Sequence, residues 1–396
     1  MARTCTYSWQ GESGKAEWIF DGEALLLVPE EAAPRAFALK ECAGLSGDGY
    51  TLELAYADQR LVLQRLGQDG PTLLESLWRT WLPARAEALR IAGSGTPGHF
   101  QGSWNQRPCA ILLYEDMLLL APEGGDLQPF FLSLLQRISF DESTYAVRLT
   151  GWDGQTTALA RLAGQTGTLL GAAKAARAVL SKEAGETAAR HLPTLPTAAR
   201  AVLSATWLPG RLMRVGDLEM GCPGFTSAFR DSWIKASLRE KEAQALLHWA
   251  GAEGTWAGFG RPGLGLEEPV TEDQAPGAAT SEKASAQPTA EPPDCLLWLL
   301  CGKGDAWLLE TLTEQNHATY RFAGGSELPL LASQLLCAPQ FSREALYMPL
   351  EALTDERSGL AIAARELAFL RELRARFRGR AIHGSMDRWR GEAGVR

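Results

Sequence analysis

An internal repeat constrains this chain more than any other feature of its sequence. The segment Leu25–Glu30 (LLLVPE) returns 93 residues later as Leu118–Glu123 (LLLAPE). Four more residues match at the same offset: Phe37, Leu39, Ser46 and Asp48 correspond to Phe130, Leu132, Ser139 and Asp141. Further along the chain the offset becomes 96. There Leu63, Arg65, Leu66 and Thr72-Leu73-Leu74 correspond to Leu159, Arg161, Leu162 and Thr168-Leu169-Leu170. Matched blocks separated by short insertions are typical of repeated units whose loops differ in length. Residues 18–92 and 99–180 are therefore interpreted as two copies of one small module.

Each copy is predicted to contain several short strands and one closing helix. Thr51–Tyr56 and Arg60–Gln64 alternate apolar and polar side chains, as strands with one buried face do. Thr72 and Thr168 each precede apolar residues at helical spacing and can cap a helix. This order indicates an α+β fold of tandem small β-barrel or curved-sheet modules, each closed by a C-terminal helix, at 15–92 and 99–190.

The second half of the chain does not repeat these residues. Residues 195–263 are predicted to be a mixed segment, helical over 222–250 and extended over 254–260, that joins a later module. The tract 264–293 is rich in Pro, Ala, Glu, Thr and Ser and is predicted to be a disordered linker. Residues 294–350 form a third β-containing module with a helix at 328–337, and the sequence leaves open whether it is a third copy. A basic C-terminal helix and tail are expected over 359–396.

A family resemblance rests on the repeats together with three later segments, Ala318–Phe322 (ATYRF), Arg343–Tyr347 and Phe377–His383 (FRGRAIH). This combination resembles a family of uncharacterised bacterial proteins that carry tandem pleckstrin-homology-like modules. The resemblance implies a pleckstrin-homology-like (PH-like) fold for each module and supplies no catalytic residue. Phosphoinositide-binding relatives of that fold have a basic first hairpin, whereas Phe20-Asp21-Gly22-Glu23 is acidic here. Inositol phosphate binding is therefore not expected.

Bulk properties exclude several classes of function. A net charge of −8 favours neither nucleic acid nor an anionic membrane as a partner of the whole chain. The N-terminus lacks an apolar leader, and no apolar stretch reaches the length of a membrane span, so a cytoplasmic protein is expected. The seven cysteines are irregularly spaced without a C-x-x-C pair. Reduced core thiols are predicted rather than a disulfide framework or a zinc site.

No motif predicts a cofactor, a metal or a catalytic residue. Gly258–Gly263 reads G-x-G-x-x-G, but it runs into the predicted linker instead of opening a helix, so it is not interpreted as a dinucleotide site. Gly302-Lys303-Gly304 lacks the rest of a phosphate-binding loop and reads as a turn. The five histidines, at positions 99, 191, 248, 317 and 383, stand apart without metal-ligand spacing.

The basic C-terminus is the strongest candidate for a binding patch. From Arg357 onward the chain holds ten arginines and four acidic residues, a net charge of +6. Arg371, Arg374, Arg378 and Arg380 could bind nucleic acid, phospholipid or an acidic partner. The structural interpretation is favoured: cations at a helix end complement its dipole, and an acidic body can pair with them.

The sequence therefore favours a non-catalytic bacterial adaptor or scaffold that binds a protein partner through module surfaces or an exposed strand edge. Duplicating a module multiplies binding surfaces more readily than it builds an active site. A nucleic-acid or anionic-membrane binder acting through the C-terminal arginines is the first alternative. An enzyme of unknown class is the second. The oligomeric state is left open.

Overall fold

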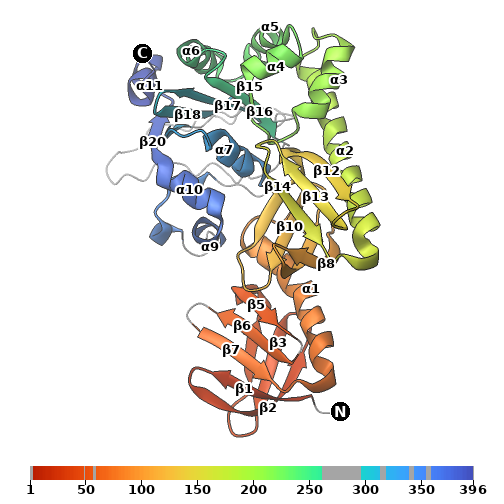
Figure 1. Ribbon diagram of the computed structural model, residues 1–396. Coiled ribbons are helices and arrows are strands. Elements are labelled where there is room, and N and C mark those ends of the chain that lie inside the picture. Colours follow the sequence, from red (N-terminus) through yellow and green to blue (C-terminus); the bar gives the residue numbers. More distant parts are fainter. Residues whose placement is uncertain are drawn as a thin grey trace, which may run out of the picture. The chain divides into compact units, whose positions relative to one another are not determined.

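The computed structural model describes residues 3–48, 50–56, 59–260, 296–312, 318–338, 343–353 and 358–395. The predicted linker at 264–293 lies outside the described residues, as do Asp58 and His317. The chain divides into two compact units. Unit 1 comprises Met1–Val179 and Leu350–Leu367, and unit 2 comprises Leu180–Pro349 and Ala368–Arg396. Both contain antiparallel sheets and helices, so the predicted α+β class is confirmed (Figure 1).

Unit 1 contains two seven-stranded antiparallel sheets. The first has the order β4-β3-β2-β1-β7-β6-β5. Its strands are β1 (Thr4–Trp9), β2 (Glu12–Phe20), β3 (Ala24–Pro29), β4 (Arg35–Ala38), β5 (Gly44–Gly47), β6 (Thr51–Tyr56) and β7 (Gln59–Gln64). Alternate leucines, such as Leu25, Leu27 and Leu54, are fully buried on the inner face. The helix α1 (Gly70–Ala88) follows this sheet.

The second sheet has the equivalent order β11-β10-β9-β8-β14-β13-β12. Its strands are β8 (Gly98–Trp104), β9 (Arg107–Leu113), β10 (Met117–Pro122), β11 (Gln128–Phe131), β12 (Leu135–Asp141), β13 (Ala146–Gly151) and β14 (Thr156–Ala160), and α2 (Thr166–His191) follows. A left-handed backbone conformation also recurs: Arg65 (φ 60°) in the first module and Arg161 (φ 55°) in the second occupy equivalent positions, 96 residues apart in the sequence. The duplication inferred from sequence therefore extends to every element of the module.

Ring contacts show that both sheets curl. Trp9 on β1 and Phe37 on β4 have ring centroids 5.0 Å apart, and Trp104 on β8 and Phe130 on β11 have centroids 6.3 Å apart. Each pair joins strands three positions apart, which would be about 14 Å apart in a flat sheet. The sheet must therefore bend back on itself, as a partly closed barrel does.

Two local predictions for the modules differ from the structure. The first copy begins at β1, eleven residues before the predicted boundary at 15, because Thr4–Trp9 carries few large aliphatic side chains. Thr72 and Thr168 do not cap the closing helices, which begin earlier, at Gly70 and Thr166. The backbone turns η2 (Gly67–Asp69) and η4 (Ala163–Gln165) lead directly into these helices.

Helix α1 also receives a segment from late in the chain. Leu73, Leu77 and Trp81 are buried on its inner face, and the indole of Trp81 donates a hydrogen bond of 2.8 Å to the Cys42 carbonyl. Arg85, only 3% exposed, pairs with Glu366 on α9 (Ser358–Glu366). This ion pair is a direct contact between the segment Leu350–Leu367 and the first module.

Unit 2 is built on one six-stranded antiparallel sheet. Its strands, in order along the sheet, are β15 (Met213–Arg214), β16 (Thr255–Gly260), β17 (Leu296–Lys303), β18 (Ala306–Thr311), β19 (Ala318–Ala323) and β20 (Phe377–Ile382). Both faces of β16 and β17 are buried, so these strands are apolar almost throughout. A strand buried on both faces loses the polar and apolar alternation of a half-exposed one.

Helices cover the two faces of this sheet. One face, which includes Ala257 and Leu299, packs in a common core with helices from before β16 and with the last helix of the chain. These helices are α3 (Thr197–Thr206), α4 (Val215–Gly221), α5 (Phe225–Ala228) with the π-helical turn Phe229–Ile234, α6 (Glu240–Ala250) and α11 (Met386–Ala393). Strands β16, β19 and β20 also contact α7 (Leu328–Cys337), α10 (Ala368–Arg376) and α8 (Glu344–Tyr347), respectively.

The sheet of unit 2 extends beyond the predicted module at 294–350. Strands β15 and β16 come from before the predicted linker, and β20 comes from within the segment 359–396 that was expected to be a basic helix and tail. The first part of that segment forms two helices, α9 and α10, separated at Leu367, instead of one basic helix. Phe377–Ile382 is extended because it pairs with β19 from Ala318 to Phe322. The strand order also differs from that of the two repeated sheets.

Candidate functional site

The four arginines of the predicted basic patch lie on α10 and β20. Arg374 is half-buried, and its guanidinium donates hydrogen bonds to the carbonyl oxygens of Ala345 and of Met348, the latter at 2.7 Å. The guanidinium carbon of Arg380 lies 4.0 Å from the ring centroid of Tyr347, a cation–π contact. Two of the four arginines are therefore engaged with the segment 345–348 within unit 2.

The other two arginines of this patch are exposed. Arg371 lies on the outer side of α10, and Arg378 lies at the start of β20. The guanidinium of Arg378 donates to the carbonyl oxygens of Ala375 and Phe377, at 2.9 and 3.0 Å. It therefore covers polar backbone groups where α10 passes into the edge strand.

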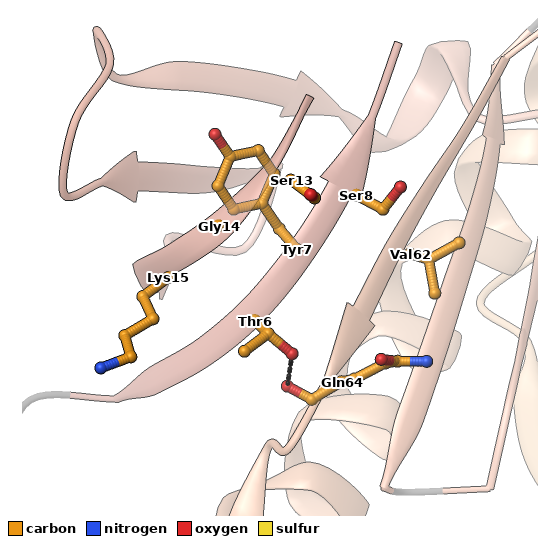
Figure 2. Close-up of a pocket in the computed structure, with 8 residues that line it drawn as sticks. All are labelled: Thr6, Tyr7, Ser8, Ser13, Gly14, Lys15, Val62 and Gln64. Carbon is orange, nitrogen blue, oxygen red and sulfur yellow. Dashed lines mark hydrogen bonds between the residues drawn. The ribbon is translucent and has the colours of Figure 1, made fainter. Parts of the chain in front are cut away.

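An open groove of about 600 Å³ lies on the first sheet, along β1, β2 and β7. Figure 2 shows its lining residues, which are Thr6, Tyr7, Ser8, Ser13, Gly14, Lys15, Val62 and Gln64. The Thr6 hydroxyl donates to the Gln64 carbonyl oxygen at 3.4 Å, and Lys15 is the single charged residue of the lining. The lining contains no carboxylate, imidazole or thiol that could act with Lys15 as an acid–base pair.

This groove belongs to the first module alone. Tyr7 pairs with Leu63, and Trp104 pairs with the matching Leu159 of the second module. After Tyr7 the β1–β2 hairpin continues through Ser8 and Trp9 before it turns, whereas the β8–β9 hairpin turns directly after Trp104. The Ser8–Ser13 pair, which lines the groove, therefore has no counterpart in the second copy.

A duplicated feature does appear at the tip of one hairpin in each module. Tyr50 immediately precedes β6, Tyr145 immediately precedes β13, and both side chains are 69% exposed. The flanking registers agree, since Leu45 faces Leu54 in the first module and Ile138 faces Leu149 in the second. The two tyrosines therefore occupy corresponding positions at the ends of the β5–β6 and β12–β13 hairpins.

An aspartate shapes each of these tips. A carboxylate oxygen of Asp48 accepts hydrogen bonds from the backbone N–H groups of Thr51 (2.8 Å) and Tyr50 (2.9 Å). Asp141 accepts bonds from the hydroxyl and N–H of Ser143 and from the hydroxyl of Thr144. These hydrogen bonds hold the pKa of both carboxyl groups below the ordinary range. The largest cause at Asp48 is the bond from the Thr51 N–H, and the largest cause at Asp141 is the bond from the Ser143 hydroxyl. Ionised aspartates therefore fix the backbone that presents each tyrosine.

The two tips differ in their surroundings. Tyr145 has a left-handed backbone (φ 54°), and its ring contacts Phe140 edge-on with centroids 5.2 Å apart. The residue at the position of Phe140 in the first module is Gly47, whose N–H donates to Glu123 of the β10–β11 turn at 3.3 Å. A bare aromatic ring on a fixed turn is a suitable anchor for a protein interface, because it buries a large area with few rotatable bonds.

Sequence comparison missed the tyrosines although it matched the two aspartates. Asp48 and Asp141 are 93 residues apart, but the second loop is two residues longer, so Tyr50 and Tyr145 are 95 apart. An alignment with a constant offset places Tyr50 opposite Ser143. The alternation of β6 and β13, which restores the register after the loop, is the signal that could have revealed the pair.

The cysteines of the described segments are free thiols. Cys5, Cys42, Cys109, Cys222 and Cys301 are buried and Cys337 is half-buried, which confirms the predicted core thiols, and Cys295 lies outside the described residues. Burial raises the thiol pKa of Cys42 to about 11 and those of Cys109 and Cys301 to about 12. The thiolate is the nucleophile, so these groups are poorly reactive in the folded chain.

A pKa two units above the ordinary value lowers the thiolate fraction at pH 8 about a hundredfold. We therefore expect iodoacetamide to alkylate Cys42 at least about a hundredfold more slowly in the native chain than in urea. Peptide mass spectrometry of timed samples measures each rate separately. Equal native and denatured rates at Cys42 would show that this thiol is accessible in the fold.

Comparisons with known proteins give no further guidance. No protein-family model matches the chain, and a search of curated protein sequences finds no significant match.

Within the described segments, no helix is long and apolar enough to cross a membrane. No group of three or more His, Cys, Asp or Glu side chains among the same residues is arranged to hold a metal ion.

Proposed function

We propose that this chain is a non-catalytic bacterial cytoplasmic adaptor that binds a protein partner through its two repeated modules. The observation that carries the proposal is the pair of tyrosines, Tyr50 and Tyr145, each 69% exposed at the same hairpin tip of its module. Aromatic side chains are enriched in protein interfaces relative to the rest of the protein surface. Two such anchors on one unit suit a partner that engages both modules.

The modules are proposed to be PH-like. Seven antiparallel strands that curl into a partly closed barrel and lead into one C-terminal helix support this assignment in both copies. A fold of this type hosts many unrelated functions, so the binding role rests on the tyrosine tips and not on the fold. The alternative through the basic patch has weaker support, because Arg374 and Arg380 already hold the segment at 345–348.

Replacing both tyrosines with alanine is expected to abolish partner binding while lowering stability by at most about 1.5 kcal/mol, the upper value for an aromatic pair such as Tyr145 with Phe140. Each single variant should keep weak binding, because losing one of two linked contacts removes avidity but leaves the other contact. A photoreactive amino acid at position 50 or 145 of the full chain would first capture the partner in its native host. Calorimetry with the purified partner would then measure the affinity of each variant.

Ile19→Ala provides a matched control, because Ile19 is an exposed apolar residue (52%) of the first module outside the hairpin tips. This variant should bind as tightly as the natural chain. Full affinity in the double tyrosine variant would contradict the proposal. Loss of binding on neutralising Arg371 and Arg378, with the tyrosine variants unaffected, would favour the basic patch instead.

A further inference from the structure

A histidine lies between two carboxylates in the core of unit 2. His383, which follows β20, has a side chain only 4% exposed. Its Nε2 lies 3.1 Å from a carboxylate oxygen of Glu310 on β18, and its Nδ1 lies 3.3 Å from one of Glu242 on α6. The Glu310 side chain is fully buried. Both ring nitrogens of His383 therefore face acceptor groups.

With both carboxylates ionised, this geometry requires a doubly protonated ring. A neutral imidazole carries one N–H and presents a lone pair at the other nitrogen, which would repel one of the two carboxylates. Only the doubly protonated ring can donate to Glu310 and Glu242 at once. With both carboxylates ionised, the arrangement therefore depends on the second proton of the ring.

Uncharged groups from two further elements complete the site. The hydroxyl of Thr319 on β19 donates to Glu310 and lies 3.5 Å from Nε2 of His383. The indole of Trp389 on α11 donates to the Thr319 hydroxyl at 2.7 Å, and its ring stacks on His383 with centroids 6.1 Å apart. Trp389 is 1% exposed. The network therefore includes the first turn of the last helix as well as the strands.

The charges around His383 balance only while the ring is a cation. The Arg239 guanidinium lies 4.0 Å from Glu242, so two carboxylates and two cations face one another. On α11, Glu392 accepts from the Ile382 N–H at 3.0 Å and pairs with Arg388. Losing the ring proton would leave a net negative charge in a buried site, and uncompensated buried charge is strongly destabilising.

The segment that this network retains is the C-terminus, β20 with α11. Strand β20 is the last strand of its sheet and pairs along β19 alone. Other attachments of this segment include the buried side chains of Ala381, Trp389, Ala393 and Val395 and the contacts of His383. We propose that Glu310, His383 and Glu242 form a proton-dependent latch, which holds β20 and α11 on the sheet and releases them when His383 loses its second proton.

Amide hydrogen exchange of the full chain tests this latch. Protection of residues 377–395, normalised to β17 in the same molecule to remove the intrinsic pH effect, should fall as the pH rises between about 5 and 8. One linked proton allows at most about a tenfold change per pH unit, so a total loss of tenfold or more is expected. His383→Gln should remove this pH dependence. Protection that does not change with pH in the natural chain would overturn the proposal.

A matched control and a second measurement keep the test decisive. His248→Gln changes another histidine, on α6, and should leave the pH dependence intact. If His383→Gln does not fold, the 15N resonances of the His383 ring in the natural chain give the answer, since they distinguish a doubly protonated ring from a neutral one. A neutral ring at the acidic end of this range, or an unchanged pH dependence in the folded His383→Gln variant, would refute the latch.

Discussion

Replacing Trp207 with alanine is expected to destabilise unit 2 by about 3–5 kcal/mol, the cost of removing a large buried aromatic side chain. Trp207 follows α3 and is 1% exposed. Its ring contacts Phe225 and Phe259 edge-on, with centroids 5.3 and 5.0 Å apart. Its indole N–H donates to the Ala257 carbonyl oxygen on β16 at 3.0 Å. One residue thus packs against both the helices and the sheet.

Denaturant unfolding monitored by the exchange of β16 and β17 amides would measure this loss in unit 2 specifically. Trp207→Phe separates the two contributions, because it keeps most of the ring volume but loses the hydrogen bond. Trp256→Ala is the matched control, since Trp256 is a half-buried tryptophan in the same unit and should cost clearly less. A Trp207→Ala chain within about 1 kcal/mol of the natural one would contradict the described core.

Replacing Arg85 with alanine is expected to destabilise unit 1 by about 1–3 kcal/mol. Removing one partner of a fully buried ion pair costs about 3–5 kcal/mol, and the lower value applies here because the Glu366 side chain is 40% exposed and keeps part of its hydration. The buried aliphatic stem of Arg85 also contributes packing that alanine loses. Hydrogen exchange of α9 should increase together with the loss of global stability.

The same helix offers a control. Arg79 pairs with Glu75 at 2.8 Å, but the two side chains are 67% and 50% exposed, so Arg79→Ala should change stability by less than about 0.5 kcal/mol. A double-mutant cycle of Arg85→Ala with Glu366→Gln isolates the pair and should give a coupling energy of about 0.5 kcal/mol or more. Equal effects of the Arg79 and Arg85 substitutions would show that α9 does not depend on this contact.

The repeated modules could be predicted because their signal is local and occurs twice. The two LLL-x-PE blocks became β3 and β10, and the leucines of Thr51–Tyr56 alternate into the barrel as expected. The strand β1 was missed because Cys5 and Tyr7 are its inward residues, and neither gives the aliphatic alternation that identifies a strand. Its place in the sheet depends on pairing with β7, which no local pattern encodes.

Long-range pairing also explains what the sequence did not reveal in unit 2. Arg-rich Phe377–Ile382 has helical neighbours, and only its partner strand β19 makes it extended. His383, Glu310 and Glu242 are spread over 141 residues, so no spacing rule could bring them together. The histidine that stands alone in the sequence contacts Glu310, Glu242, Thr319 and Trp389 in the core of unit 2.

The pairing of Arg85 with Glu366 has a consequence for how the protein is made. These residues are 281 positions apart, and a ribosome adding roughly 5–20 residues per second needs roughly 15–60 s to cover that distance. The first module emerges early, but throughout that interval Arg85 lacks its partner Glu366, and the face of α1 that α9 contacts is uncovered. The exposed face of α1 in nascent chains is therefore expected to need protection from non-native contacts. A chain released before Glu366 would contain both modules, but the first module would lack its contact with α9.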